Sequence, residues 1–208
     1  MAQVPAGVIL CGGQASRFGG DKARAALAGA SLLQHVARRV APQVSELFLS
    51  AQADTPLPDE LDARLVPDAV QRHRGPLAGL YSALEYLQGE ATADWLLLCP
   101  CDAPFVPRDL AARLAASVTG KDCLVAAARY DGVVQPTFSL WSLETLPAVR
   151  RTVLDQGAGG LMRMLDGLQH ACVDWPAAEP PPFFNVNTPA DLAEAERLLD
   201  AAGASGRH

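Results

Sequence analysis

Hydrophobic positions along this chain fall into two alternating patterns, short continuous apolar runs and longer stretches with helical spacing. The continuous runs, bounded by Gly, Pro or Asp, cover residues 4–10, 46–51, 95–99 and 123–128. Runs of this length are typical of strands that are buried on both faces of a sheet. We therefore predict a buried strand in each of them.

Stretches with helical spacing separate these runs and carry recognisable start signals. In residues 31–40 apolar side chains recur on one face, and Ser31 stands in front of them as an N-cap candidate. Ahead of residues 189–199, Thr188 is a second cap candidate and Pro189 takes the first helical position. The same spacing predicts further helices over residues 76–87, 107–116 and 143–154.

The order of these elements predicts the fold class. Strand and helix alternate over the first 115 residues, which favours right-handed crossovers onto a mostly parallel sheet. We expect a doubly wound, Rossmann-like α/β sheet with helices on both faces, as a single domain over residues 1–200 with a flexible tail at 201–208. Ligands of such sheets bind beyond the carboxyl ends of the strands, so the loops at that edge are the place to look for chemistry.

Composition and charge narrow the function classes. The 208 residues are half apolar and 19% charged, as in ordinary globular proteins, and the net charge of −6 disfavours nucleic acid and anionic membranes as partners. The start of the chain has no basic flank and no apolar run is long enough for a bilayer, so export and membrane insertion are disfavoured. Five scattered cysteines, an odd number, predict reduced thiols in a cytoplasmic protein.

A glycine-rich loop follows the first predicted strand. Gly12-Gly13 and Gly19-Gly20 bracket Arg17, and Lys22 comes two residues later. Backbone N–H groups of consecutive glycines can form an anion nest, and Arg and Lys would add positive charge toward a phosphate. The spacing matches neither a Walker loop nor the dinucleotide fingerprint. The alternative interpretation is a glycine-rich surface turn.

Two aspartates follow other apolar runs. Asp102 comes just after residues 95–99, where a carboxylate could hold Mg²⁺ that bridges phosphates, since Mg²⁺ uses only one or two protein carboxylates. The alternative is that Asp102 caps the next helix. Asp68 precedes three basic residues and the segment 75–79, whose Gly-Pro helix start also suits an anion. A solvated loop charge is the alternative for Asp68.

A pair of amides is the last candidate for ligand binding, and the sequence offers no evident general base. Asn185 and Asn187 would face the same side of an extended segment, although an ordinary turn before a helix is the alternative. No Ser-His-Asp or Cys-His arrangement stands out. Nucleotidyl transfer to a phosphate needs no strong base, because that acceptor is already ionised near pH 7; alignment, Mg²⁺ and cations suffice.

Four blocks together resemble the bacterial molybdenum cofactor guanylyltransferases (MobA family) of the nucleotidyltransferase superfamily. They are Leu10-Cys11-Gly12-Gly13 with Arg17, Gly19, Asp21 and Lys22; Gly75-Pro76-Leu77-Ala78-Gly79; Pro100-Cys101-Asp102; and Asn185-Val186-Asn187-Thr188-Pro189. The resemblance implies an enzyme that transfers GMP from GTP to the terminal phosphate of molybdenum-molybdopterin, forming the guanine dinucleotide cofactor and pyrophosphate. It also implies a nucleotide-binding half at about 1–115 and an acceptor-binding half at about 116–200.

The same resemblance assigns roles to individual residues. Catalysis would fall to Lys22, Arg17 and Asp102, with Asp102 as the Mg²⁺ ligand. The nucleotide would contact Leu10, Cys11, Gly12, Gly13, Lys22, Ser50, Asp68 and Asp102, and the acceptor would contact Asn185, Asn187 and Gln135. Two positions depart from the family pattern, since Cys11 stands where the family usually has alanine and Ser50 where it has asparagine.

Other functions stay open at this stage. A molybdopterin cytidylyltransferase or a sugar-phosphate nucleotidyltransferase would share the phosphate loop, and base specificity separates them. A non-catalytic nucleotide or cofactor carrier is the alternative from another class, and it would not need both Lys22 and Asp102. The resemblance also implies transient contact with cofactor-insertion chaperones or apo-molybdoenzymes, although no residue identifies such a surface.

Overall fold

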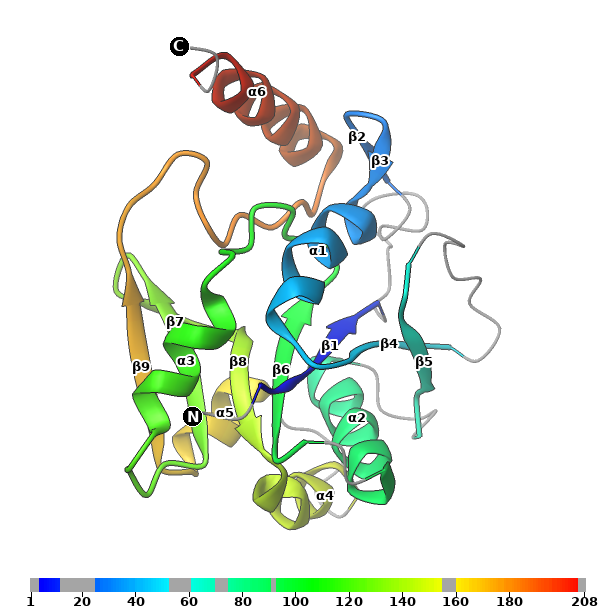
Figure 1. Ribbon diagram of the computed structural model, residues 1–208, viewed down its shortest axis with the longest axis vertical. Helices are drawn as coiled ribbons and strands as arrows, with labels where there is room; N and C mark the ends of the chain where they lie inside the picture. Colours follow the sequence, from blue (N-terminus) through cyan, green and yellow to red (C-terminus); the bar gives the residue numbers. More distant parts are fainter. Residues whose placement is uncertain are drawn as a thin grey trace.

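The computed structural model describes residues 4–11, 25–52, 61–69, 75–90, 93–154 and 160–205 (Figure 1). Seven strands in this part form one sheet in the order β5-β4-β1-β6-β8-β7-β9. Their bounds are β1 (Ala6–Leu10), β4 (Leu47–Ala51), β5 (Arg64–Pro67), β6 (Trp95–Pro100), β7 (Val125–Tyr130), β8 (Val133–Ser142) and β9 (His170–Trp175). A two-stranded hairpin of β2 (Ala26–Leu27) and β3 (Ala30–Ser31) lies apart from this sheet.

Helices alternate with the strands along the chain. They are α1 (Leu32–Val40), α2 (Pro76–Glu90), α3 (Leu110–Val118), α4 (Leu146–Leu154), α5 (Leu161–Asp166) and α6 (Pro189–Ser205), with two short 3₁₀ helices, η2 (Ala41–Gln43) and η3 (Leu143–Thr145). β1 pairs in parallel with β4 and β6, β5 pairs in parallel with β4, and β9 pairs in parallel with β7. β8 is antiparallel to both of its neighbours, β6 and β7. The predicted mostly parallel α/β sheet in a single domain is confirmed.

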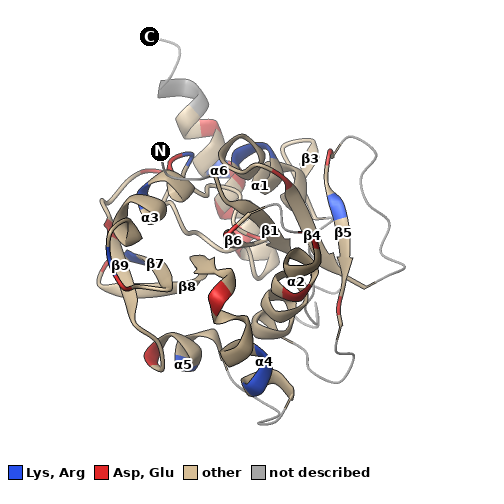
Figure 2. Ribbon diagram, turned by 60° about the horizontal axis from the view of Figure 1, so that its bottom comes forward, with Lys and Arg blue, Asp and Glu red and all other residues tan. Residues whose placement is uncertain are grey.

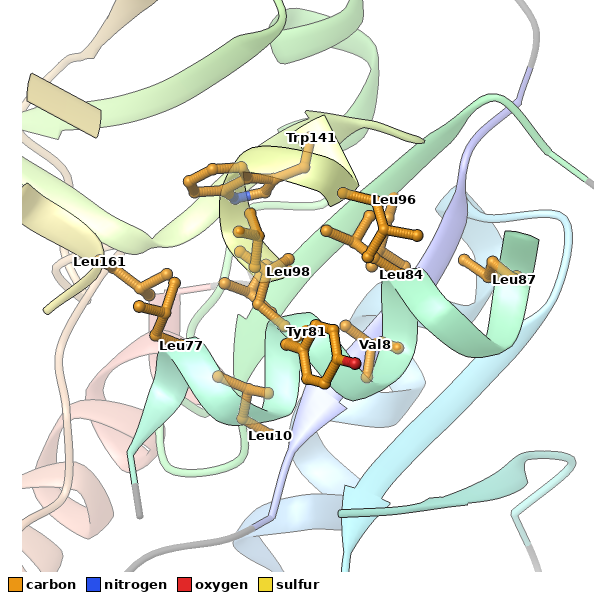
Figure 3. Packing of buried hydrophobic residues seen from close by; sticks show 14 of the residues in the cluster. Val8, Leu10, Leu77, Tyr81, Leu84, Leu87, Leu96, Leu98, Trp141 and Leu161 are labelled. Atoms are coloured by element: carbon orange, nitrogen blue, oxygen red, sulfur yellow. The ribbon is translucent and has the colours of Figure 1, made fainter. Parts of the chain in front are cut away.

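The sheet is buried on both faces, as its continuous apolar runs predict. On one face, side chains of α2, α4 and α5 belong to one core cluster with those of β1, β6 and β8; Figure 3 shows Leu77, Tyr81 and Leu84 of α2 among side chains of β1 and β6. On the other face α1 and α3 cover the sheet. Alternate residues of β1 serve the two clusters, because successive side chains of a strand point to opposite faces. A third cluster joins α6 to the β2–β3 hairpin.

Local signals in the sequence explain several element boundaries. Ser31 caps α1 through a capping box with Gln34, whose backbone N–H donates to the Ser31 hydroxyl at 3.2 Å. Thr188 caps α6 in the same manner, and the backbone N–H groups of Asn187 and Thr188 donate to the Asp191 carboxylate. Asp131 and Gly132 both adopt positive φ, which gives the tight turn between β7 and β8.

Some boundaries differ from the predictions. The helix expected over 107–116 begins only at Leu110, and the helix expected to end at residue 199 continues to Ser205, so most of the predicted tail is helical. β8 and β9 are strands that the apolar runs do not predict. None of the five cysteines, all in the described part, forms a disulfide. Among the described residues there is no helix with the length and apolar character that crossing a bilayer requires.

Candidate functional site

The carboxyl ends of four parallel strands, β1, β4, β5 and β6, meet at one edge of the sheet. Four of the residues predicted for the site lie in this edge or directly after it: Leu10 ends β1, Ser50 lies in β4, Asp68 follows β5 and Asp102 follows β6. Backbone hydrogen bonds continue the ladder past the strand ends, since Cys101 N–H donates to the Leu10 carbonyl at 3.2 Å. The fold therefore brings these candidates together at one edge of the sheet, the site edge.

The entrance to the glycine-rich loop is anchored to the neighbouring strand. The backbone N–H of Cys11 donates to the Ser50 carbonyl at 2.8 Å, and its half-buried thiol lies 3.7 Å from the Ile9 carbonyl. Leu10 is buried at the end of β1. Residues 12–24 lie outside the described part, and with them the predicted site residues Gly12, Gly13, Arg17 and Lys22. Their roles stay predictions.

Ser50 and Asp68 form a direct hydrogen bond at this edge. The Ser50 hydroxyl, with the residue only 2% exposed, donates to Oδ1 of Asp68 at 2.9 Å. The backbone N–H of Asp68 donates to the Ala51 carbonyl at 3.3 Å, which extends the β4–β5 ladder by one residue. Asp68 is therefore held by both its backbone and its side chain. The alternative of a merely solvated loop charge does not describe it.

Helix α2 begins beside these residues and approaches the strands closely. Gly75 takes a φ of 144°, a value that L side chains rarely adopt, just before Pro76 starts the helix. A Cβ atom on Gly79 would lie 2.6 Å from Cδ2 of Leu10 and 2.8 Å from Oγ of Ser50. The lack of a side chain at position 79 lets the first turns of α2 pack directly on the site edge.

Asp102 lies next to the segment that carries the paired asparagines. Its backbone carbonyl accepts a 2.8 Å hydrogen bond from the N–H of Val186, which is fully buried. α3 begins at Leu110, after Asp109, so the alternative in which Asp102 caps the next helix is wrong. Oδ1 of Asn185 is buried and has no hydrogen-bond partner among the described residues. A carboxylate and an amide oxygen thus lie on two segments whose backbones are hydrogen-bonded to each other.

Carboxylate and amide oxygens are chemically suited to a hard divalent cation. Mg²⁺ binds carboxylate and carbonyl oxygens and uses few protein ligands, and a buried amide oxygen that lacks a donor is the kind of group that a cation or a ligand N–H satisfies. No cluster of three or more His, Cys, Asp or Glu side chains suited to a metal occurs within the described ranges. Burial raises the pKa of the Cys99 thiol, which keeps it protonated, so this residue packs in β6 as a small apolar group.

The acceptor-side candidates are less closely joined. Asn187 is exposed, and its side-chain N–H₂ donates to the Asn185 carbonyl at 3.5 Å. Gln135 lies near the start of β8, which runs antiparallel to β6, so this end of β8 reaches the same edge as the carboxyl end of β6. Its side chain donates to the Val133 carbonyl at 3.4 Å. The contacts of Gln135 leave its predicted role untested.

One residue of this edge escaped the sequence analysis. Ser82 of α2, 3% exposed, accepts a 2.9 Å hydrogen bond from the N–H of Ala69 and donates to the Ala78 carbonyl at 2.9 Å. It therefore anchors the residue after Asp68 to α2. A serine inside an apolar helical stretch was the available signal.

Acidic and basic positions elsewhere are interspersed over the elements rather than gathered on one of them (Figure 2).

Comparisons with known proteins show the family to which the chain belongs. The sequence pattern of the family described as "MobA-like NTP transferase domain" matches residues 7–173. The chain is 38% identical over 194 residues, 92% of each chain, to a molybdenum cofactor guanylyltransferase of Bradyrhizobium sp. (strain ORS 278). It is 37% identical over 209 residues, 92% of this chain and 95% of the other, to a protein of the same name from Acidovorax ebreus (strain TPSY).

Solved structures share the fold. Molybdopterin-guanine dinucleotide biosynthesis protein A from Archaeoglobus fulgidus superposes with a TM-score of 0.78 at 22% identity, covering 94% of this chain and 99% of that one. 2-C-methyl-D-erythritol 4-phosphate cytidylyltransferase from Thermus thermophilus gives a TM-score of 0.68 at 20% identity, covering 95% and 99%. Similarity at these identities shows the fold and not the substrate.

Proposed function

We infer, from the premise that this chain belongs to the MobA-like NTP transferase family, that it is a molybdenum cofactor guanylyltransferase. The observation that carries the inference is the 38% identity to a guanylyltransferase over 92% of both chains. The enzyme transfers GMP from GTP to molybdenum-molybdopterin and releases pyrophosphate. The cytidylyl, sugar-phosphate and non-catalytic alternatives lack a comparable match among these relatives.

The reaction is a displacement at the α-phosphorus of GTP. An oxygen of the acceptor's terminal phosphate forms a bond to the α-phosphorus while the bond from that phosphorus to the bridging oxygen of pyrophosphate breaks. The acceptor oxygen is already ionised near pH 7, so no side chain has to remove a proton. The chain's task is therefore to hold two anionic substrates in line and to neutralise charge that shifts onto the departing pyrophosphate.

The residues at the site edge and in the glycine-rich loop have distinct proposed roles. Leu10 and Cys11 border the base, Asp68 accepts a hydrogen bond from the nucleotide, and Asp102 would hold Mg²⁺. Mg²⁺ supplies charge neutralisation at the phosphates when bound. Arg17 and Lys22 add positive charge, Gly12 and Gly13 offer backbone N–H groups, and the acceptor contacts Asn185, Asn187 and Gln135. The hydrogen bond between Asp102 and Val186 supports this arrangement because it joins the metal-binding and acceptor segments.

Two further assignments belong to the proposal. We propose that the halves at about 1–115 and 116–200 bind nucleotide and acceptor respectively, because the strands that lead to Leu10, Ser50, Asp68 and Asp102 all fall in the first and Asn185 in the second. We also propose a cytoplasmic enzyme that passes its labile product directly to cofactor-insertion chaperones or apo-molybdoenzymes.

A labelling experiment tests the function. Purified protein, Mg²⁺ and molybdenum-loaded molybdopterin are mixed with α-³²P-labelled GTP, CTP or ATP, and the label is followed into the pterin product. We expect label from GTP alone, and none when the divalent cation is chelated. Label from CTP would instead show the cytidylyl activity, and tight GTP binding without any label would support the carrier.

A further inference from the structure

Ser50 lies in β4 at the site edge, paired with Leu10 of β1 and Val66 of β5, and is buried. It is 2% exposed in β4, and Gly79 of α2 covers it so closely that a Cβ atom there would lie 2.8 Å from the Ser50 hydroxyl oxygen. A buried hydroxyl must satisfy its hydrogen-bonding capacity inside the protein. The family pattern implies a direct contact between the nucleotide and this position, but the Ser50 side chain is almost fully covered by the protein.

The hydrogen bond of the Ser50 hydroxyl runs in one direction, from Ser50 as donor to Asp68 as acceptor. An ionised carboxylate only accepts hydrogen bonds, so the single hydroxyl proton of Ser50 points to Oδ1 of Asp68, 2.9 Å away. A hydrogen bond to a charged acceptor is stronger than one between neutral groups. It restricts rotation of the carboxylate, whose Oδ2 has no hydrogen-bond partner among the described residues and could accept from a ligand.

The backbone around Asp68 is fixed as well. Its own N–H donates to the Ala51 carbonyl, and the N–H of Ala69 donates to the buried hydroxyl of Ser82 at 2.9 Å. The Ser50 carbonyl also accepts from the Cys11 N–H at 2.8 Å. Ser50 therefore contacts both segments, the entrance to the glycine-rich loop through its backbone and Asp68 through its side chain.

We propose that Ser50 is a positioning residue that strengthens nucleotide binding through Asp68 by holding the carboxylate in the orientation that accepts from the nucleotide. The proposal rests on the proposed function. The shared chemistry is a hydrogen-bond donor of the nucleotide, which is either an N–H of the base or an O–H of the ribose. A carboxylate held in place beforehand loses less conformational freedom on binding, so the gain appears as affinity.

A double-mutant cycle tests the coupling. GTP affinity is measured by calorimetry for the full-length protein and for the variants Ser50→Ala, Asp68→Ala and both together. We expect Ser50→Ala to weaken GTP binding about tenfold, the range typical of a hydrogen bond to a charged group. In the Asp68→Ala background the same change should have almost no effect, because the group on which Ser50 acts is missing.

Two control variants separate positioning from folding. Ser50→Cys keeps the approximate shape but is a weak donor, so it should weaken GTP binding like Ser50→Ala while the thermal midpoint stays near the wild-type value. Ser142→Ala makes the same change at a buried serine at the end of β8, which pairs with Trp95 at the amino end of β6; there the Ser142 hydroxyl accepts from the N–H of Glu144. It should lower stability and leave GTP affinity unchanged.

Nucleotide analogues identify the donor. Inosine triphosphate lacks the 2-amino group of guanine and 2′-deoxy-GTP lacks one ribose hydroxyl. The penalty of Ser50→Ala should shrink with the analogue that lacks the group bound by Asp68. Equal losses from Ser50→Ala in the presence and absence of the Asp68 carboxylate would overturn the proposal, and so would full affinity in Ser50→Cys. If the wild-type protein binds GTP and transfers GMP, either result removes this inference and leaves the proposed function intact.

Discussion

At the scale of single residues, the Asp102 carboxylate is the most direct test of the proposed metal site. Asp102→Asn keeps the shape of the side chain and the backbone hydrogen bond to Val186, but it removes the negative charge that would hold Mg²⁺. We expect GMP transfer to fall by about 100-fold or more, since charge stabilisation at the reacting phosphates has effects of that size. The thermal midpoint should change little, and initial rates at several Mg²⁺ concentrations measure the loss.

Asp109→Asn is the matched control for this variant. It makes the same carboxylate-to-amide change just before α3, where Oδ2 of Asp109 lies 3.8 Å from Nη1 of Arg113. Transfer should remain at the wild-type rate, because this exposed ion pair lies outside the proposed site. An Asp102→Asn enzyme with wild-type transfer would contradict the assignment of the metal ligand.

The sequence allowed some site residues to be predicted, for a physical reason. Leu10, Cys11 and Asp102 end or directly follow apolar runs, and the carboxyl ends of parallel strands are where ligands bind. The hydrogen bond between Ser50 and Asp68 could not be predicted in the same way, because the two residues are 18 positions apart and meet only once β4 and β5 are known to be neighbours. Ser82 depends on the same missing information.

At the scale of elements, substitutions at two glycines of α2 are expected to change the stability of the fold in opposite directions. Gly79→Ala would place a methyl group 2.6 Å from Leu10 and 2.8 Å from Ser50, so α2 or the strand ends must shift. We expect a loss of about 1–3 kcal/mol in the free energy of unfolding, as in other overpacked cores, together with weaker GTP binding. Urea denaturation and calorimetry measure the two effects.

Gly89→Ala in the same helix is the control. A Cβ atom there meets nothing within 4 Å, so the change only removes backbone freedom from the unfolded chain. We expect a gain of about 0.5–1 kcal/mol and unchanged GTP affinity. Equal stability of the two variants would show that α2 does not approach the strands as closely as the structure has it.

The pairing of β7 with β9 includes a cross-strand ion pair whose contribution depends on pH. Arg129 and Asp174 are opposite each other in the ladder, with hydrogen bonds of 2.6 and 2.7 Å. The hydrogen bond from Arg129 lowers the pKa of Asp174 below its ordinary value. A carboxyl with a lowered native pKa stabilises the fold above its unfolded pKa, about 3.9, and this contribution is lost as pH falls through the lower native value.

Asp174→Asn should therefore be less stable than the wild type at pH 7, with a difference that shrinks as the pH is lowered below about 4. The difference should be small, because the Asp174 side chain is 67% exposed, and smaller still at high salt. Urea denaturation at pH 7 and pH 3 measures it, with Asp122→Asn in an exposed loop as the control. A difference that grows on acidification would contradict the pairing.

Strand β8, which the sequence did not predict, has an interrupted apolar pattern. β1, β4, β6 and β7 are short apolar runs and were recognised, whereas β8 contains Gln135, Pro136 and Ser139, which interrupt its apolar pattern. These polar residues are accommodated because the β7–β8 register shifts between Ala127 and Ala128, and the Ser139 hydroxyl donates to the Pro136 carbonyl. Tertiary pairing, rather than local preference, makes this segment a strand.

At the scale of the whole molecule, the site joins segments that are distant in the chain. Leu10, Asp68, Asp102 and Asn185 belong to segments connected by the backbone hydrogen bonds of the site edge, and these segments span most of the domain. A ligand that bridges them should stabilise the fold as a unit, because unfolding any one segment would release it. Nucleotide binding is therefore expected to be visible in global unfolding as well as locally.

Thermal unfolding with nucleotides tests this coupling. GTP with Mg²⁺ at about 100 times its dissociation constant should stabilise the native state by about 2.7 kcal/mol, which for a domain of this size corresponds to a midpoint increase of roughly 5–10 °C. CTP and ATP at the same concentration should give much smaller shifts if the base is recognised. Asp102→Asn should reduce the shift specifically in the presence of Mg²⁺, because without the metal both proteins bind GTP through the remaining contacts. Equal shifts for all three nucleotides would mean that the site holds the phosphates alone, and base selection would then have to arise in the transfer step.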